Sequence, residues 1–532
     1  MTMEPTATRR PIDPDGLSMD GIRDGALRGR AVTVLGFARS GIALARFLVD
    51  TGADVTIYDG RPAMELAGAI AALDGRTVRL LLGPNVDPVE AWRDAELVTS
   101  SPSINPDFPT TEPRLRAALG ELVRRRRAGD PSAPAVIWEP DLFLRLCPSP
   151  TIGITGTKGK TTTSALIQAV LAVDPAHRAI LGGNMGRPIV ERLPELGPDD
   201  RVVFELSELQ LPTLSRGTTV AVYTNVTADH LDRHGDLAAY RRVKRRLAEL
   251  VDPRGALVLN ADDPVVATYA APGGARTVTY RLDAPASGGL GVVDGWIVAS
   301  DVAPLRGLPG EPEAAVGNDP AAGLLRILPV AELAIPGRHN VSNAVAAVAV
   351  GLLFGVEPAA IRRAVATFRG VEHRLETVDV LDGIRYVNDS QGTQPDAVTA
   401  ALFAFDGPIV LIAGGRDKSV DLSALARAVA ERAAAAVLIG ESAADMERLF
   451  AEAGLRTIER APTLEGAVRR AGALAREAAD AAGEREAGHP SDPVATVLLS
   501  PAAASFDMFP DYEARGRAFK AAVAALPRKG GH

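Results

Sequence analysis

The chain has 532 residues, and 58 Lys or Arg against 66 Asp or Glu give it a formal net charge of −8. This acidic balance argues against nucleic acid as a partner, because a phosphate backbone requires a basic face. The single cysteine, Cys147, excludes an intramolecular disulfide framework, and no apolar run is long enough to span a bilayer. We therefore expect a cytoplasmic protein without membrane insertion, and its length predicts about three domains.

The first part of the chain predicts a leader followed by a βαβ unit. Residues 1–28 are polar and punctuated by proline and glycine, which predicts a flexible leader. From residue 31 the chain reads as strand, glycine turn, helix and strand, and the turn is GFARSG, Gly36 to Gly41. Because the turn departs from G-x-G-x-x-G, a dinucleotide-type site and a structural turn are equally good interpretations of it alone. Asp59 ends the second strand, where such folds place an acid that reads a ribose or base.

A phosphate-binding loop is predicted within residues 151–163, TIGITGTKGKTTT. A β-branched strand leads into a glycine loop, and an apolar-periodic helix follows Lys160. Glycines let backbone N–H groups approach phosphate oxygens, the helix start adds unpaired donors, and the Thr161 hydroxyl can join a Mg²⁺ shell. The alternative is a glycine turn before a surface helix, but strand, Gly-Lys-Thr and helix coincide here, which favours a phosphate site.

The central region continues to alternate between strands and helices, which predicts a parallel sheet. Ligands of such sheets bind at the carboxyl ends of the strands. Glu205, Asn225, Asp229 and His230 follow predicted strands. The glycine loop, Glu205 and His230 together suit a Mg²⁺-ATP site. Residues 282–325 are rich in Gly, Pro and Ala and are expected to form an insertion or a loose loop.

The fold class predicted from these patterns is α/β with three domains. Residues 29–148 form a Rossmann-like domain, 149–370 a P-loop ATPase-like domain with a parallel sheet, and 371–532 a doubly wound α/β domain. The Pro-rich stretch from 131 to 150 marks the first boundary.

Eleven motifs in one order resemble those of the Mur ligase family of peptidoglycan synthesis. They include GTKGKTTT (156–163), GGNMGRP (182–188), ELSELQL (205–211), NVTADHLDRH (225–234), NADD (260–263), HRLE (373–376), NDSQGT (388–393), GGRDKS (414–419) and LLSPAAASFDMF (498–509). The last string and the GFARSG turn are similar to the branch of the family that adds D-glutamate. The resemblance extends from about Val32 to Phe519.

The resemblance implies an ATP-dependent ligase that joins D-glutamate to UDP-N-acetylmuramoyl-L-alanine through an acyl phosphate, with ATP and two Mg²⁺ ions, acting as a monomer. The N-terminal domain would bind the UDP end of the substrate without redox chemistry, through Ser40, Asp59 and Arg61. The nucleotide would be held by Gly156, Thr157, Lys158, Gly159, Lys160, Thr161, Thr162, Asn260, Arg374 and Asp389. Thr161, Glu205, His230 and Lys244 match metal-site positions, and Lys160, Glu205, His230 and Lys244 the catalytic ones.

Two further sets of residues are implied to bind substrates. Asn184 and Ser207 match contacts to the muramoyl-alanine portion, and Thr393, Lys418, Ser505, Phe506 and Tyr512 match the pocket of the incoming amino acid. Lys244 matches a lysine that is carbamylated in this family. Carbamylation turns a cation into an anion, so only the modified Lys244 could bridge Mg²⁺, and the amine must first be neutral.

Three departures from the family pattern leave the core positions intact. Glu208 and Leu209 stand where the family usually has Ser-Phe, Gln391 replaces a lysine, and Ser103 replaces the glycine of a Ser-Pro-Gly loop. The nearest alternative function is a sibling ligase that adds another amino acid, such as L-glutamate. A nicotinamide-dependent oxidoreductase, suggested by the first βαβ unit, leaves the Gly-Lys-Thr loop unexplained. A catalytically silent relative is disfavoured by the intact Lys160 and Lys244.

Overall fold

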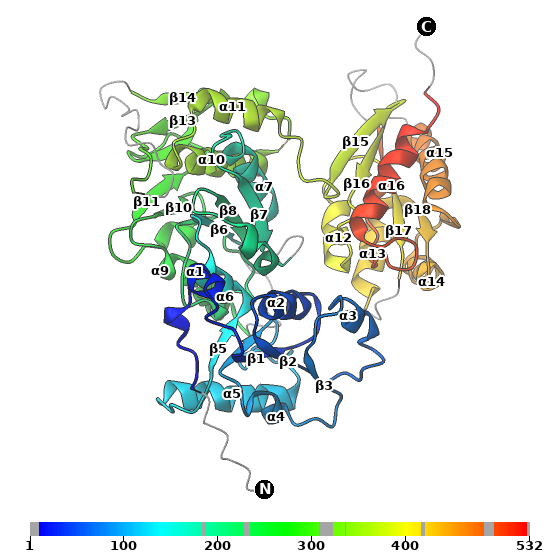
Figure 1. The fold of residues 1–532 in the computed structure, drawn as a ribbon. Coiled ribbons are helices and arrows are strands. Elements are labelled where there is room, and N and C mark those ends of the chain that lie inside the picture. The colour runs from blue at the N-terminus through cyan, green and yellow to red at the C-terminus, as the bar shows by residue number, and fades with distance from the viewer. Residues whose placement is uncertain are drawn as a thin grey trace. The chain divides into compact units, whose positions relative to one another are not determined.

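The computed structural model describes residues 10–183, 188–227, 235–307, 323–335, 337–416, 421–482 and 494–528. The chain divides into two compact units, Met1–Phe368 and Arg369–His532, which we call unit 1 and unit 2 (Figure 1). Unit 1 contains two sheets and unit 2 contains one. The predicted α/β class is confirmed, whereas the domain boundaries at residues 148 and 370 stay a prediction.

The first sheet of unit 1 is parallel and has the strand order β3-β2-β1-β4-β5. Its strands are β1 (Ala31–Leu35), β2 (Asp54–Asp59), β3 (Arg79–Leu82), β4 (Leu97–Ser100) and β5 (Ala135–Trp138). The helices around it are α2 (Arg39–Asp50), α3 (Ala67–Ala71), α4 (Pro88–Trp92), α5 (Pro113–Arg127) and α6 (Glu139–Leu146). Apolar side chains of α2 and α6 pack on one face and those of α4 and α5 on the other. The strand order reverses between β1 and β4, which places the GFARSG turn beside the Ser101 loop at the crevice typical of such folds.

The predicted leader contains regular structure from residue 14, whereas its flexibility and its boundary at residue 28 stay predictions. It forms the 3-10 turn η1 (Pro14–Gly16) and the helix α1 (Met19–Arg23), whose starts are capped by the side chains of Asp13 and Ser18. Met19 and Ile22 are buried, because their spacing of three places both on the helix face that meets the core. A stretch this short, broken by glycine and proline, gives too weak a periodic signal to predict this packing.

The second sheet of unit 1 has the order β14-β13-β12-β11-β10-β9-β6-β8-β7. Its strands are β6 (Thr151–Thr155), β7 (Ala179–Gly183), β8 (Arg201–Glu205), β9 (Val220–Tyr223), β10 (Ala256–Asn260), β11 (Arg276–Tyr280), β12 (Gly289–Val293), β13 (Trp296–Ser300) and β14 (Leu325–Pro329). The pairing is parallel from β7 to β12 and antiparallel from there to β14. The expectation of a loose loop over 282–325 is therefore wrong for residues 289–300, which form a hairpin that extends the sheet.

Helices cover both faces of this second sheet. The helices α7 (Lys160–Leu171), α10 (Arg338–Leu353) and α11 (Pro358–Thr367) pack on one face, and α9 (Leu237–Leu250) packs on the other. The helix α10 is buried almost all round, in line with its continuous apolar sequence.

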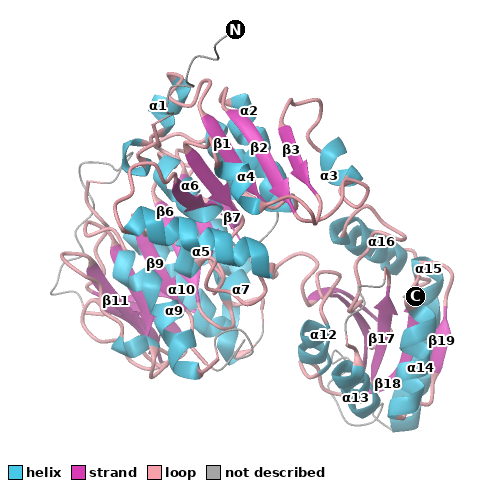
Figure 2. Ribbon diagram, turned by 90° about the horizontal axis from the view of Figure 1, so that it is seen from below, coloured by secondary structure: helices cyan, strands magenta, loops and turns pink. Residues whose placement is uncertain are grey.

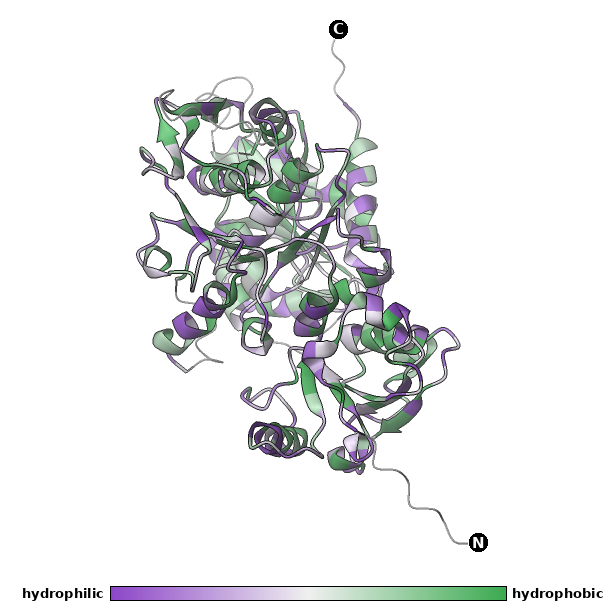
Figure 3. Ribbon diagram, turned by 60° about the vertical axis from the view of Figure 1, so that its left-hand side comes forward, coloured by the Kyte–Doolittle hydropathy of each residue, from purple (hydrophilic) through white to green (hydrophobic). Residues whose placement is uncertain are grey.

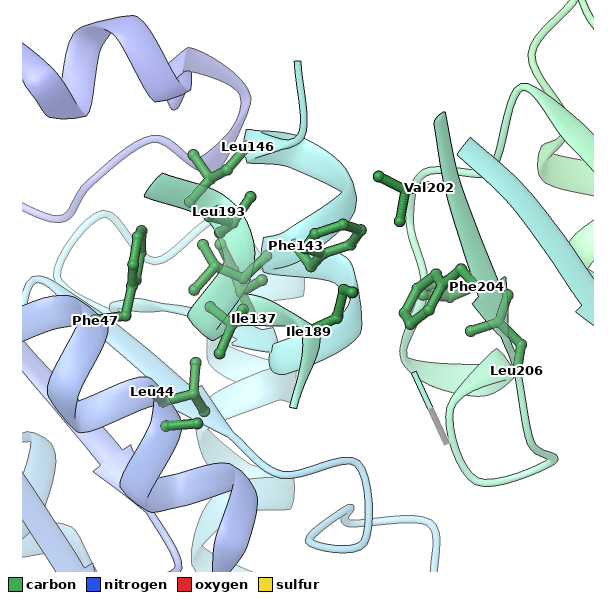
Figure 4. Close-up of a cluster of buried hydrophobic side chains, with 14 of the residues drawn as sticks. Leu44, Phe47, Ile137, Phe143, Leu146, Ile189, Leu193, Val202, Phe204 and Leu206 are labelled. Carbon is green, nitrogen blue, oxygen red and sulfur yellow. The ribbon is translucent and has the colours of Figure 1, made fainter. Parts of the chain in front are cut away.

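One continuous hydrophobic cluster joins the two sheets of unit 1. Figure 4 shows Leu44 of α2 and Phe143 of α6 on one side and Phe204 of β8 on the other, with Ile189 of the 3-10 segment η2 (Ile189–Glu195) between them. The rings of Phe143 and Phe204 are tilted, with centroids 5.3 Å apart. The core of unit 1 therefore extends across both sheets.

Unit 2 is built on a sheet of order β15-β16-β20-β17-β18-β19, parallel apart from the antiparallel edge pair β15 and β16. Its strands are β15 (Glu376–Leu381), β16 (Ile384–Asn388), β17 (Ile409–Gly414), β18 (Ala433–Ile439), β19 (Ile458–Arg460) and β20 (Ala495–Leu499). The helices α15 (Leu464–Ala482) and α16 (Tyr512–Ala524) pack on one face, and α12 (Pro395–Leu402), α13 (Ser423–Arg432) and α14 (Ala443–Ala453) on the other. Figure 2 shows these helices packed against the strands. Figure 3 shows that helices of the chain carry both hydrophobic and hydrophilic residues, as helices with one buried face do.

Candidate active site

The predicted phosphate loop joins β6 to α7. Gly159, with φ 85°, is the N-cap of α7, and Gly156 has φ 150°. A Cβ at Gly156 would lie 2.0 Å from Thr224 Oγ1, and one at Gly159 would lie 2.7 Å from Asn343 Oδ1. Both positions therefore require glycine, for backbone conformation and for space. The backbone N–H groups of the first turn of α7 follow this loop, which is the arrangement that binds a phosphate.

Asn225, at the end of β9, fixes the conformation of the loop. Its backbone carbonyl accepts a hydrogen bond from Thr157 N at 2.7 Å, and its side-chain Oδ1 accepts one from Lys158 N at 2.9 Å. Its Nδ2 donates to Lys158 O at 2.9 Å, and Thr224 Oγ1 donates to the same carbonyl at 2.7 Å. From the sequence alone, Asn225 is predicted at a strand end without a specific role. The sequence pattern that could have indicated this role is the run of polar residues directly after a buried strand.

Thr161 and Glu205 meet beneath the loop. The Thr161 hydroxyl donates to Glu205 Oε2 at 2.9 Å, and both side chains are buried. Thr161 lies in the first turn of α7 and Glu205 ends β8, which pairs directly with β6. Hydroxyl and carboxylate oxygens are ligands that Mg²⁺ prefers. Thr161 and Glu205, both predicted as metal positions, therefore lie side by side, and their role in binding a metal stays a prediction.

Two lysines donate to one carbonyl oxygen of the loop. Lys160 Nζ lies 3.0 Å and Lys244 Nζ 2.9 Å from Gly156 O. Lys244 is fully buried on α9, with its Nζ 5.5 Å from the ring centre of Tyr240. The Tyr240 hydroxyl is in turn hydrogen-bonded to Thr157 Oγ1 at 3.0 Å. The helix α9 is thereby joined to the phosphate loop by side chains that the sequence separates widely.

Other predicted ligand positions of unit 1 surround the same strand ends. Asn260 Nδ2 donates to Thr224 O at 2.7 Å, so it lies beside the strand end that supports the loop. Ser207 follows Glu205, and its N–H and hydroxyl both donate to Gln210 Oε1 at 2.9 and 3.0 Å. Thr162 is half-buried in the first turn of α7. Glu208, one of the departures from the family pattern, is also buried.

At the carboxyl edge of the first sheet, Asp59 organises the GFARSG turn. Its carboxylate accepts from Phe37 N at 2.8 Å, from Arg61 N at 3.0 Å, and from the Arg61 guanidinium at 3.0 and 2.8 Å. Burial raises the pKa of Asp59, but these hydrogen bonds outweigh it and hold the pKa below its ordinary value. Ser40 lies in the first turn of α2, directly after this turn. The three residues predicted for the UDP end thus share one edge of one sheet.

In unit 2, Asp389 follows β16 and is buried. Its carboxylate accepts from Ser500 Oγ at 2.5 Å and from Leu375 N at 3.2 Å. Burial raises the pKa of Asp389 to about 6, against the lowering effects of these hydrogen bonds and of Arg374. Gln391, which replaces a family lysine, has a buried side-chain oxygen that accepts no hydrogen bond within the part of the chain described.

The remaining residues predicted for the amino acid lie in the loops around the same strand ends of unit 2. Thr393 follows β16, and Ser505 and Phe506 follow β20, with Ser505 buried and Phe506 64% exposed. Tyr512 begins α16, and its backbone carbonyl accepts from Ser390 Oγ at 2.8 Å. Asn184, His230 and Lys418 lie outside the described residues, so their predicted roles stay predictions.

The residues present fit a nucleotide and a divalent cation. The two glycines allow the loop a conformation and a close packing that side chains would prevent, and the Thr161–Glu205 pair supplies hard oxygen donors beside the loop. Among the described residues, no three His, Cys, Asp or Glu side chains form a metal-binding group of their own. Within the same residues, no helix has the length and hydropathy needed to cross a membrane.

Two family models match the chain at these sites. The model of the Mur ligase middle domain matches residues 154–304, which contain the phosphate loop, Glu205 and Lys244. The model of the Mur ligase, glutamate ligase domain matches residues 373–481, which contain Arg374 and Asp389. Together with the relatives described next, these matches place the fold and the loop in one class: the chain belongs to the Mur ligase family.

The relatives that match almost the whole chain carry one particular name. The UDP-N-acetylmuramoylalanine--D-glutamate ligase of Pelotomaculum thermopropionicum is 38% identical over 500 residues, 94% of this chain and 98% of that protein. The enzyme of that name from Symbiobacterium thermophilum is 38% identical over 494 residues, 93% of this chain and 97% of that protein. A solved pseudomurein peptide ligase type C from Methanothermus fervidus is 20% identical, with a TM-score of 0.43, over 94% of this chain and all of that one.

Proposed function

We propose that this chain joins D-glutamate to UDP-N-acetylmuramoyl-L-alanine at the expense of ATP, a step of peptidoglycan precursor synthesis. The observation that carries the proposal is the near full-length similarity to D-glutamate ligases, at 38% identity over 94% of the chain. The phosphate loop and the Thr161–Glu205 pair supply the chemistry that such a reaction requires. A sibling ligase with another amino acid is the alternative, and the names of the relatives favour D-glutamate.

ATP binding is assigned to the loop between β6 and α7. The backbone N–H groups of Gly156 to Thr162 and the helix start would hold the phosphates, and Lys160 would supply a positive charge. Lys160 now donates to two loop carbonyls, Gly156 O and Thr157 O, at 3.0 and 2.9 Å. Its ammonium group is therefore held at the loop, within reach of a bound phosphate. Asn260 in unit 1 and Arg374 and Asp389 in unit 2 are proposed to contact the rest of the nucleotide.

Magnesium is assigned to Thr161 and Glu205, with His230 and Lys244 as further positions, and we propose two ions. Mg²⁺ bound there would neutralise charge on the phosphate oxygens of the nucleotide. For Lys244 to be a metal ligand it must carry an anion, as a carbamate does. The buried Lys244 Nζ and Lys160 Nζ both donate to Gly156 O, which places the Lys244 amine at the loop where the cation would bind. A neutral amine is the form that reacts with CO₂.

The reaction follows from these positions. The alanine carboxylate of the nucleotide-sugar substrate attacks the γ-phosphorus of ATP, ADP leaves, and an acyl phosphate forms. The amine of D-glutamate then attacks the acyl carbon, a tetrahedral intermediate forms, and phosphate leaves with the former carboxylate oxygen. Lys160 stabilises the charge of the transferring phosphoryl group. Glu205 and Thr161 keep the phosphate side of the site polar and fixed.

The substrates are assigned to the remaining strand ends. Ser40, Asp59 and Arg61 would hold the UDP end, and Asn184 and Ser207 the muramoyl-alanine portion. Thr393, Lys418, Ser505, Phe506 and Tyr512 would form the D-glutamate pocket of unit 2. We further propose a monomer that works in the cytoplasm, where ATP is available. Light scattering on the purified chain and cell fractionation would check these two points.

The experiment that tests the function measures phosphate release from Mg²⁺-ATP in the presence of UDP-N-acetylmuramoyl-L-alanine. The purified chain is given D-glutamate, L-glutamate or no amino acid. We expect release that depends on D-glutamate and a product heavier by one glutamyl residue. Release with L-glutamate alone would keep the chemistry and overturn the D-glutamate assignment. ATP binding without release in any arm would favour the catalytically silent relative.

A further inference from the structure

A cavity of about 610 Å³ lies between the ordered leader, the end of α2 and η2. Its wall includes Ile22 of α1, Phe47 and Asp50 of α2, and Glu191 and Pro194 of η2. Small-molecule sites typically have volumes in the range of about 300 to 1,000 Å³. The cavity is therefore large enough for a metabolite, and residues 19–25 form one of its walls.

The cavity is separate from the sites assigned to ATP and the UDP end. Arg28 precedes β1, and Gly52 precedes β2, so the cavity lies at the amino edge of the first sheet. Ser40 and Asp59 lie at the carboxyl edge of the same sheet. The helix α2 has 12 residues and spans about 18 Å between the two edges. A ligand of the cavity would not compete with a nucleotide at the GFARSG turn.

The charged side chains that line the cavity have an excess of cations. Four arginines, Arg23, Arg28, Arg46 and Arg76, face two carboxylates, Asp50 and Glu191. Arg76 is bound to Asp50 by hydrogen bonds of 2.8 and 2.9 Å, and Arg46 lies 3.5 Å from Glu191. These pairs neutralise both carboxylates. Arg23 is paired with Asp20 at 3.2 Å, outside the lining, so Arg28 is the one lining arginine without a carboxylate partner among the described residues.

Arg28 is the member of the set that points to a ligand. Its side chain lies over two turn glycines: a Cβ at Gly25 would be 3.8 Å from its Nε, and one at Gly52 would be 3.6 Å from its Cγ. Arg28 forms no ion pair with any residue that the structure describes. Because a guanidinium has five donors in a planar fork that matches phosphate oxygens, an Arg28 without a carboxylate partner is suited to bind a phosphate.

The remainder of the wall is apolar. This apolar part of the wall is formed by Met19, Ile22, Phe47 and Pro194, of which the first three are largely buried. A free inorganic anion would leave this surface uncovered. A ligand with a phosphate at one end and a hydrocarbon or aromatic group at the other would match both parts of the wall.

We propose that this cavity binds a phosphate monoester that carries an apolar group, with Arg28 as its anchor. The ligand would bridge α1 and α2 of the first sheet to η2, which precedes β8. Because η2 separates the first sheet from β8, which ends in Glu205, a bound ligand would stabilise the arrangement of the two sheets of unit 1.

The test uses phenyl phosphate as the probe and isothermal titration calorimetry on the full chain. UDP and Mg²⁺-ADP are present at saturating concentration, so that the nucleotide sites are filled. We expect one additional site per chain for phenyl phosphate and weaker binding of inorganic phosphate. The variant Arg28→Glu should weaken phenyl phosphate at least about tenfold, and Arg28→Gln should weaken it to a smaller extent.

The matched control is Arg93→Glu, which makes the same charge change at an exposed arginine of the same sheet region, outside the cavity. Arg93→Glu should bind phenyl phosphate as the unchanged chain does, and unliganded melting temperatures should agree among the variants. Phenyl phosphate should raise the melting temperature of the unchanged chain and of Arg93→Glu but not of Arg28→Glu. Absence of the additional site, or equal weakening in Arg28→Glu and Arg93→Glu, would overturn the proposal.

Discussion

Thr161 and Glu205 are joined by a hydrogen bond of 2.9 Å from the threonine hydroxyl to Oε2 of the carboxylate, at the base of the phosphate loop. The two residues come from different elements, the start of α7 and the end of β8, and both are buried. A buried carboxylate bound by a hydroxyl under a phosphate cradle is poised for a hard cation. The proposed metal role of this pair can therefore be tested by substituting the threonine.

Replacing Thr161 by valine should impair Mg²⁺-dependent turnover. The change keeps the shape but removes the hydroxyl, so kcat/KM should fall by about 10- to 100-fold and the Mg²⁺ requirement should rise. The matched control is Thr163→Val, which removes the buried hydrogen bond from Thr163 to Asn343 on the same helix. Both variants should lose about 1 kcal/mol of stability, but only Thr161→Val should change the Mg²⁺ dependence. Equal kinetic effects would count against a metal role.

Replacing Gly156 by alanine should destabilise unit 1 and abolish nucleotide binding. The new Cβ would lie 2.0 Å from Thr224 Oγ1, so the loop must shift in addition to adopting a strained backbone. Gly295→Ala is the control, because Gly295 has a positive φ but open space around it. We expect a cost of about 1 to 3 kcal/mol for Gly295→Ala and a larger one for Gly156→Ala, measured by urea unfolding. Similar costs would show that the Thr224 contact is easily relieved.

Lys244 should carry a carbamate when CO₂ is supplied. Native mass spectrometry of the chain in bicarbonate should reveal an adduct of one CO₂, and bicarbonate should increase ligase activity. Lys244→Arg keeps a hydrogen-bond donor near Gly156 O but has no amine that can form a carbamate, so both effects should disappear. An adduct that persists in Lys244→Arg would place the modification elsewhere.

Glu139 should make the stability of unit 1 depend on pH. Burial raises the pKa of Glu139 to about 7, against weaker lowering effects of the Val190 N–H and Arg39, and its Oε1 has no hydrogen-bond partner among the described residues. Because the folded pKa exceeds the unfolded value of 4.5, the native state binds more protons between these pH values. The stabilisation that protonated Glu139 contributes to unit 1 is therefore fully present below about pH 4.5 and is lost as the pH rises through about 7.

Glu139→Gln isolates this effect, because glutamine stays neutral at every pH. The free energy of unfolding of the variant, relative to the unchanged chain, should rise from pH 5 to pH 8 by up to about 3 kcal/mol. Tryptophan fluorescence during urea unfolding reports on unit 1 alone, since Trp92, Trp138 and Trp296 all belong to it. A difference that is constant across this range would show that Glu139 does not titrate there.

Phe143 and Phe204 should couple the two sheets of unit 1 (Figure 4). Each ring is fully buried, and truncation of either one to alanine should cost about 3 to 5 kcal/mol. In a double-mutant cycle the pair should show a coupling free energy of about 0.5 to 1.5 kcal/mol, because the two rings are neighbours with centroids 5.3 Å apart. Phe143→Ala and Phe450→Ala form the control cycle, since Phe450 belongs to unit 2. Additivity in the first cycle would contradict the contact.

The sequence by itself determined the α/β class, the phosphate loop and the strand-end acid Glu205. These features are local: a strand, a glycine loop and a helix start occupy thirteen consecutive residues, and strand ends are visible from periodicity. The family followed from motifs of the same local kind. The sequence did not predict the hairpin at residues 289–300 or the buried face of α1, because short segments rich in glycine and proline carry little periodic signal.

Tertiary structure alone decided which distant groups meet. Lys160 and Lys244 donate to one carbonyl, although Lys244 lies 88 positions from Gly156, and Asn225 holds the loop from another strand. It also decided that Met19 and Ile22 are buried and that Glu139 lies in an apolar interior. No local pattern contains these facts, because the order of strands in the sheet and the packing of helices against it set the distances between residues far apart in the chain.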